Sequence, residues 1–115
     1  STTTAVLDEL ASYRGGYTPS SIRIFIQHAE QLEAAGAPVD ARTGYVRALA
    51  TELAIEPLPT VGLMWRLGNL ARHAHRPAEA ALWFRFSLAY DAISDTLEHP
   101  TSNESILGVF RSKVR

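Results

Sequence analysis

Glycine and proline constrain this sequence most, because they stand between segments that carry apolar residues at helical spacing. Gly15-Gly16 follows the first such segment, Gly36 the second and Pro57 the third, while Pro77 stands at the start of a later one. Glycine ends helices readily in a left-handed conformation, and proline is favoured in the first helical turn and excluded from the interior. The segments between them are rich in helix formers, with 17 alanines and 13 leucines in the chain. The sequence therefore predicts an all-α fold.

The apolar spacing and the capping residues predict six helices in one domain over residues 1–115. Connections of two to six residues favour antiparallel neighbours. We therefore expect stacked antiparallel helical hairpins over residues 18–56 and 60–97, followed by a short capping helix within residues 101–115. The expected helices cover residues 5–13 with Thr4 as N-cap, residues 19–36 with Thr18 as N-cap, two segments that follow caps at Asp40 and Thr60, residues 77–97 and residues 103–112.

Composition and charge exclude several classes of protein. The chain has no cysteine, which excludes a disulfide scaffold, a thiolate metal site and a thiol nucleophile. Its 11 basic and 12 acidic residues nearly cancel, which argues against a dedicated nucleic-acid binder. No apolar run approaches the roughly 18 residues of a membrane span, and the first residues lack the basic start of a signal peptide. We therefore expect a cytoplasmic protein with no membrane partner.

Local motifs for catalysis, a cofactor or a metal are absent from the sequence. It has no nucleophile elbow, phosphate-binding loop or dinucleotide-binding glycine motif. His73 and His75 are two residues apart and so lie on different sides of a helix, whereas a chelating pair needs a spacing of four. We expect a protein that is not an enzyme and that uses neither a cofactor nor a metal. The alternative is an all-α enzyme whose active site is assembled without local motifs.

The second hairpin carries small and aromatic residues at fixed spacing. Gly68 is followed after twelve positions by Ala80, after sixteen by Phe84 and after nineteen by Ser87. This pattern resembles the tetratricopeptide repeat, a pair of helices that approach closely at small residues. The resemblance implies that Gly68 and Ala80 are the close-contact pair between the two helices. The chain departs from the family at Ala71, where an aromatic residue is customary.

The first hairpin shows the same offsets more loosely. Ala29 corresponds to the glycine of the second hairpin and lies 39 residues before Gly68, whereas repeats of this family have 34 residues. Residues at the three later offsets are Ala41, Tyr45 and Ala48. The resemblance implies a fragment of a right-handed solenoid with one good and one degenerate repeat. The alternative is an unrelated helix bundle whose hairpins close tightly on small residues.

In the family that the second hairpin resembles, the first helix of each hairpin lines a groove that holds a peptide or a partner protein. Carried over residue by residue, the resemblance implies a stripe at spacings of four, three and four, with Arg66 and His73 beside it. The stripe consists of Trp65, Asn69, Arg72 and Arg76. We expect Trp65 to be an apolar anchor, one position after the family's usual tryptophan, and Arg72 and Arg66 to bind negative charge. The alternative is an ordinary solvated helix face.

The fifth helix is apolar on two faces. We expect one stripe to face the core of the hairpin, and it consists of Ala81, Phe84, Leu88 and Ala92. The other stripe consists of Trp83, Phe86, Tyr90, Ile93 and Leu97. Each large apolar side chain contributes roughly 1.5–3 kcal/mol when it is buried, so this second stripe requires a cover. The cover is either the last helix or a second copy of the chain in a homodimer.

Together these patterns predict a non-catalytic module that binds a peptide or another protein through a groove of helical hairpins. One alternative is a regulatory factor that binds nucleic acid or a phosphorylated ligand through the arginine-rich surface from Arg66 to Arg85. The other alternative is a structural domain that forms homo-oligomers through the second stripe of the fifth helix. Binding to nucleic acid would weaken steeply with salt, whereas binding anchored on Trp65 would not.

Overall fold

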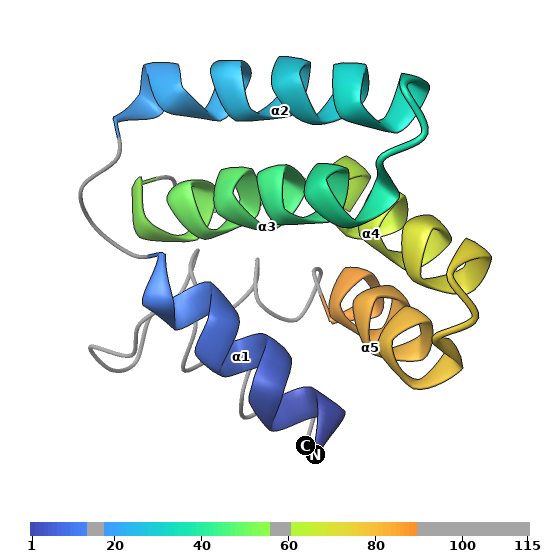
Figure 1. Ribbon diagram of the computed structural model, residues 1–115. Helices are drawn as coiled ribbons and strands as arrows, with labels where there is room; N and C mark the ends of the chain where they lie inside the picture. Colours follow the sequence, from blue (N-terminus) through green and yellow to red (C-terminus); the bar gives the residue numbers. More distant parts are fainter. Residues whose placement is uncertain (14–17, 56–60, 90–115) are drawn as a thin grey trace, which may run out of the picture.

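The computed structural model describes residues 1–13, 18–55 and 61–89, and every element in these ranges is an α-helix (Figure 1). The all-α class predicted from the sequence is therefore confirmed. The described helices are α1 (Thr2–Ser12), α2 (Pro19–Ala34), α3 (Pro38–Ile55), α4 (Val61–His73) and α5 (Pro77–Leu88).

Capping residues determine where the helices begin. α1 begins earlier than expected because Ser1 is its N-cap, and the Thr4 backbone N–H donates to the Ser1 hydroxyl at 3.3 Å. The expected cap at Thr4 is therefore wrong, whereas the expected cap of α2 at Thr18 is confirmed. α3 begins at Pro38, so the expected cap at Asp40 is also wrong. Asp40 lies instead in the first turn of α3, where a negative side chain suits the helix dipole.

α2 and α4 end in the same kind of turn. After α2, Gly36 adopts a left-handed φ of 80°, and the Ala37 N–H reaches back to a carbonyl of α2 at 2.8 Å. After α4, His75 adopts a left-handed φ of 58°, and the Arg76 N–H reaches back to a carbonyl of α4 at 2.8 Å. Such bonds close the end of a helix and reverse the chain. Each of these helices is consequently followed by an antiparallel partner.

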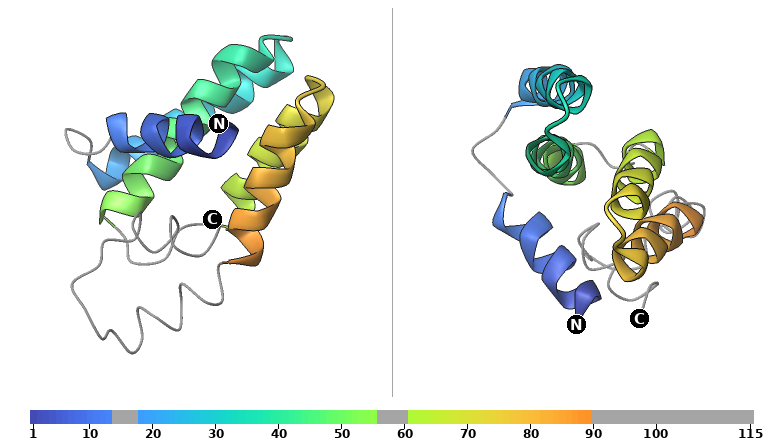
Figure 2. Two further views of the ribbon diagram at one scale, coloured as in Figure 1. Left: turned by 90° about the horizontal axis from the view of Figure 1, so that it is seen from below. Right: turned by 45° about the vertical axis from the view of Figure 1, so that its right-hand side comes forward.

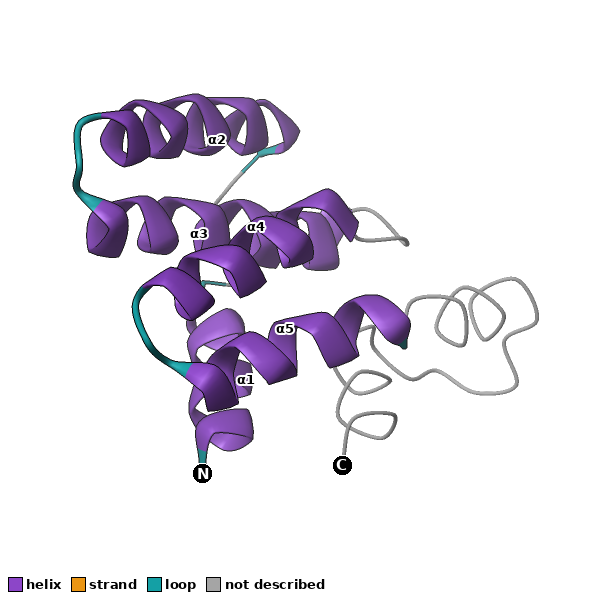
Figure 3. Ribbon diagram, turned by 90° about the vertical axis from the view of Figure 1, so that its right-hand side faces the viewer, coloured by secondary structure: helices purple, strands orange, loops and turns teal. Residues whose placement is uncertain are grey.

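α2 with α3 and α4 with α5 form two antiparallel hairpins (Figures 1 and 3). A glycine allows close approach in each of them. A Cβ atom built on Gly44 would lie 2.9 Å from the Cβ of Ala29, and one built on Gly68 would lie 2.6 Å from the Phe84 ring. Gly68 thus marks a tight contact between α4 and α5, but its nearest neighbour is Phe84 and not the expected Ala80.

α1 lies across the two hairpins and packs against both α3 and α5 (Figures 1 and 2). Its inward face buries Val6, Leu7 and Leu10 almost completely. These residues stand at positions i, i+1 and i+4, which share one side of a helix. α1 therefore closes the core that the hairpins form between α3 and α5.

The buried face of α5 is the opposite of the expected one. Trp83 and Phe86 are fully buried and pack edge to face, with their ring centroids 5.5 Å apart. Leu88 is 80% exposed, Ala81 is exposed and Phe84 is half-buried. The second stripe was expected to need a cover, and its residues Trp83 and Phe86 are covered within the chain, where α1 packs against α5. The homodimer stays a prediction, and in a single chain Trp83 and Phe86 are not accessible to a second copy.

Several expectations concern parts of the chain that the structure does not describe. These are the cap at Thr60, the remainder of the second stripe at Tyr90, Ile93 and Leu97, and the capping helix within residues 101–115. The expected extension of the fifth helix beyond the end of α5 likewise lies outside the described residues.

Candidate functional site

Most of the stripe implied by the repeat resemblance lies exposed on α4. Trp65, Asn69 and Arg72 all face solvent, with Trp65 51% exposed. Arg76 does not follow the stripe, because α4 ends at His73 and Arg76 is the N-cap of α5. Its guanidinium lies 3.8 Å from the carboxylate of Glu79. Three of the four residues of the expected stripe therefore share a helix face, and the fourth is positioned by the turn.

Trp65 belongs to an apolar surface that spans both helices of the second hairpin. Its ring packs on Phe84 of α5, with the two ring centroids 4.9 Å apart and the rings tilted by 54°. Leu88 stands one turn further along α5 than Phe84, while Asn69 stands one turn further along α4 than Trp65. We call these four residues together with Arg72 the α4–α5 surface. A half-exposed tryptophan held by a neighbouring ring is well placed to contact an apolar side chain.

Arg66, expected beside the stripe as a group that binds negative charge, is engaged within the chain. Its Nη1 donates to the Tyr45 hydroxyl at 2.9 Å and lies 3.8 Å from a carboxylate oxygen of Glu30. The Tyr45 hydroxyl donates in turn to Glu33 at 2.8 Å. Burial and the bond to Glu33 raise the pKa of Tyr45, and the bond to Tyr45 raises the pKa of Arg66. These contacts join α2, α3 and α4, so Arg66 holds the two hairpins together.

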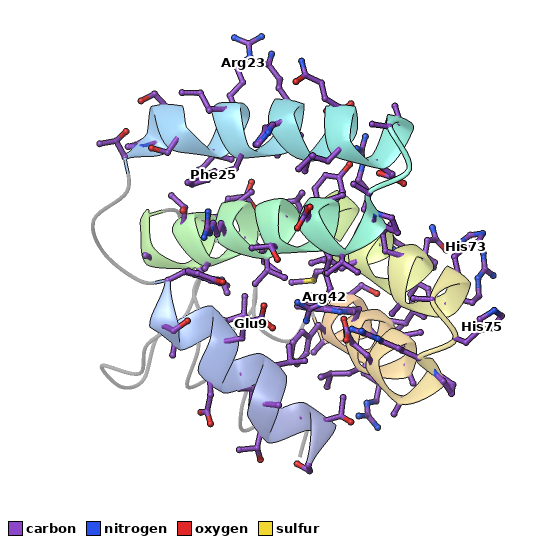
Figure 4. All side chains as sticks on the ribbon, in the orientation of Figure 1. Glu9, Arg23, Phe25, Arg42, His73 and His75 are labelled. Carbon is purple, nitrogen blue, oxygen red and sulfur yellow. The ribbon has the colours of Figure 1, made fainter. Side chains whose placement is uncertain are left out.

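The histidines lie at the turn between α4 and α5. The Nδ1 N–H of His73 donates to the backbone carbonyl of Asn69 at 2.7 Å. His73 and His75 both lie at the outer edge of the molecule (Figure 4). His73 is thus exposed beside Asn69, as expected, and its Nδ1 is occupied by the backbone of its own helix.

The charged network around Arg42 was not predicted from the sequence. Arg42 of α3 makes two hydrogen bonds to the Glu9 carboxylate of α1, at 2.8 and 2.9 Å (Figure 4). Its Nε donates to Glu79 of α5 at 2.8 Å. The indole N–H of Trp83 donates to the same oxygen of Glu79 at 3.0 Å. One guanidinium therefore links α1, α3 and α5.

The protonation states of this network follow from its hydrogen bonds. Burial disfavours a charged guanidinium, but the bonds to Glu9 and Glu79 outweigh this effect and raise the pKa of Arg42. Burial likewise disfavours a charged carboxylate, but the bonds from Trp83 and Arg42 outweigh it and lower the pKa of Glu79. Arg42 and Glu79 are therefore both charged at neutral pH, and their ion pair joins α3 to α5.

One sequence signal for this network is visible in retrospect. Glu9 lies at the edge of the buried stripe of α1, beside Leu10, and Arg42 stands beside the fully buried Ala41. Charged residues inside an apolar helix face generally require an opposite charge nearby. That signal indicates that a partner exists, but it does not say which residue the partner is.

Comparison with known proteins identified no relative of this chain. No protein-family model, curated protein sequence or solved structure matches the chain. The likeness to the tetratricopeptide repeat therefore stays a prediction. Among the described helices, none combines the length and apolar character needed to cross a bilayer. The described residues also contain no group of three or more histidines and acids that could hold a metal ion.

Proposed function

We propose that this protein is a non-catalytic module that binds a peptide or a partner protein through the α4–α5 surface. The observation that carries the proposal is the exposure of two large apolar residues on neighbouring helices, Trp65, whose ring packs on Phe84, and Leu88, one turn after Phe84. Tryptophan and arginine are typical of the residues that dominate binding at protein interfaces. The resemblance to the tetratricopeptide repeat supports the same surface, because it assigns the groove to the first helix of the hairpin.

The chemistry of the surface defines the partner. An apolar side chain would pack on the exposed part of Trp65 and against Leu88, where it displaces water from both. Arg72 would bind a carboxylate with two parallel hydrogen bonds, and Asn69 would pair with a main-chain amide. The expected partner is therefore a segment with one large apolar residue and one acidic residue.

The structure favours this proposal over the two alternatives. Arg66 is paired with Tyr45 and Glu30, which leaves fewer unpaired cations on α4 for a nucleic acid or a phosphorylated ligand. Trp83 and Phe86, which the homo-oligomer alternative requires at its interface, are buried within the chain, and this supports the α4–α5 surface instead. We therefore retain protein binding as the proposed function.

Affinity capture from the source organism, followed by titration of the captured protein, tests the proposal. Trp65→Ala should weaken binding by about thirtyfold and Arg72→Ala by about tenfold. Val39→Ala, which also shortens an exposed apolar side chain but lies on α3, is the matched control and should bind normally. If all three variants bind equally, the α4–α5 surface is not the binding site. If a nucleic acid is captured and its binding falls steeply with salt, the alternative function is correct.

A further inference from the structure

A second candidate surface lies along the first hairpin. A groove between α2 and α3 has a volume of about 460 Å³ and is open to solvent. The α2 wall is largely apolar and includes Ile24, Phe25 and Leu32, and Ile24 is 63% exposed. Phe25 points from α2 toward α3, whereas Arg23 points away (Figure 4). We call this hollow the α2–α3 groove, and it shares no residue with the α4–α5 surface.

Arg47 of α3 lines this groove, and the described residues give it no acidic partner. Its Nε is buried and makes no hydrogen bond, and no ion pair joins its guanidinium to a carboxylate of the described chain. The guanidinium carbon lies 5.2 Å from the centroid of the Tyr13 ring, a stacking contact that supplies no hydrogen-bond acceptor. Arg42 and Arg66, by contrast, are both hydrogen-bonded to side chains of other helices.

The guanidinium of Arg47, next to the apolar α2 wall, indicates which chemical group would complete the groove. Leaving a buried charged donor without an acceptor is unfavourable, whereas a carboxylate that binds it gains two charge-assisted hydrogen bonds. The Tyr13 ring holds the guanidinium in position, so little side-chain freedom would be lost when a ligand binds. The missing group is therefore an anion carried next to an apolar side chain.

The other end of the groove indicates which kind of anion fits. Asp40 lines the groove seven residues before Arg47, which is about 10 Å along α3. A nucleic acid would bring phosphates toward this carboxylate and be repelled. A protein segment can instead present an acidic residue to Arg47 and a basic residue to Asp40. The apolar wall from Ile24 to Leu32 spans about 12 Å, which matches about two turns of a helix.

We propose that the α2–α3 groove binds a partner helix that places apolar side chains against Phe25 and Leu32 and a carboxylate on Arg47. This is the binding of an amphipathic helix in a groove, with the apolar face supplying affinity and the ion pair supplying register. The surface is additional to the proposed α4–α5 site and does not depend on it.

Fluorescence anisotropy with the full chain tests this site directly. The probe is a labelled, blocked peptide of about 11 residues that is helix-forming, with leucine at spacings of three and four, one glutamate and a lysine seven residues away. Its matched partner replaces the glutamate by glutamine. The glutamate peptide should bind about tenfold more tightly than the glutamine peptide. Equal binding of the two peptides would overturn the proposal.

Two variants assign the preference to this groove. Arg47→Met should abolish the difference between the peptides, whereas Arg85→Gln, which removes an exposed cation of α5, should preserve it. Because Arg47 is partly buried, Ile24→Asp provides a second variant at an exposed position and should weaken both peptides severalfold. Circular dichroism confirms that each variant is folded.

Other occupants give distinguishable results. If light scattering shows a dimer that Ile24→Asp dissociates, the groove belongs to a second copy of the chain and the proposal is wrong. If a single-stranded oligonucleotide binds and Arg47→Met abolishes that binding, the groove takes nucleic acid and the proposal is equally wrong. If Arg47→Met keeps the full preference for the glutamate peptide, the peptide's glutamate does not bind Arg47 and the proposal is wrong.

Discussion

Replacing Arg42 by methionine removes the guanidinium that links α1, α3 and α5 while keeping a long side chain in its place. The change leaves the carboxylate of Glu79 with the indole N–H of Trp83 at 3.0 Å and with Arg76 at 3.8 Å. It also leaves Glu9 without the two hydrogen bonds that fasten α1 to α3. We expect a large loss of stability from this single substitution.

The magnitude follows from the burial of the three side chains. Removing one partner from a buried ion pair costs about 3–5 kcal/mol, because a charge is left without compensation. The Glu79 side chain is only 10% exposed, but those of Arg42 and Glu9 are 16% and 27% exposed and retain some contact with water. The lower end of the range, about 3 kcal/mol, therefore applies. For a domain of this size the melting temperature should fall by about 12 °C.

Urea unfolding followed by circular dichroism measures the loss. The double variant Arg42→Met/Glu79→Gln should be more stable than Arg42→Met alone, because it removes the unpaired charge while keeping an acceptor for Trp83. Glu9→Gln should cost only about 1 kcal/mol, since Glu9 is the most exposed member. A loss below about 1 kcal/mol for Arg42→Met, or no recovery in the double variant, would refute the reasoning.

Three further changes test other contacts by urea unfolding. Below about pH 4.3 the wild type should lose more stability than Glu79→Gln, because the fold lowers the pKa of Glu79. The contribution of this carboxylate to the free energy of unfolding is lost as the pH falls through the lowered pKa. Tyr45→Phe should cost about 1–2 kcal/mol at neutral pH by removing the hydroxyl between Glu33 and Arg66. The wild type should lose stability above about pH 10, because the fold raises the pKa of Tyr45 and this tyrosine ionises first in the unfolded chain. Tyr45→Phe should lack that loss. Gly68→Ala should cost about 1 kcal/mol, since crowding against the aromatic ring of α5 exceeds the gain in helix propensity.

Each of these expectations has a contrary result. Equal acid sensitivity of the wild type and Glu79→Gln would show that this carboxylate has no lowered pKa in the fold. An unchanged alkaline profile in Tyr45→Phe would show that another group titrates there. A Gly68→Ala variant that is more stable than the wild type would show that the ring moves aside without cost.

Helix ends were predictable where one residue type controls the backbone. Gly36 takes the left-handed conformation that ends a helix, and Pro77 begins one because its φ is already helical. Thr18 was identified as a cap for the same local reason. The cap at Ser1 and the start of α3 at Pro38 were missed because Thr4 and Asp40, a few positions later, are also favoured capping residues.

Long-range contacts were not predictable from spacing. Arg42 is separated from Glu9 by 33 residues and from Glu79 by 37. Periodicity showed two apolar stripes on α5, but the choice of the buried one depended on where α1 packs. On α4, helical spacing placed Trp65 and Arg72 on one face, and that face is exposed, while their role in a binding groove stays a prediction. The partner of Arg66 was missed because it lies in the other hairpin.

The position of α1 has a consequence for how the molecule melts. In stacked repeats each unit touches only its neighbours, so such arrays can lose units one at a time. Here the first helix in the chain covers the core between the hairpins and is bound by a side chain from the middle of the sequence. Detaching it would open that shared core to water, so both hairpins should denature in one cooperative event, with the same midpoint for a reporter placed on either.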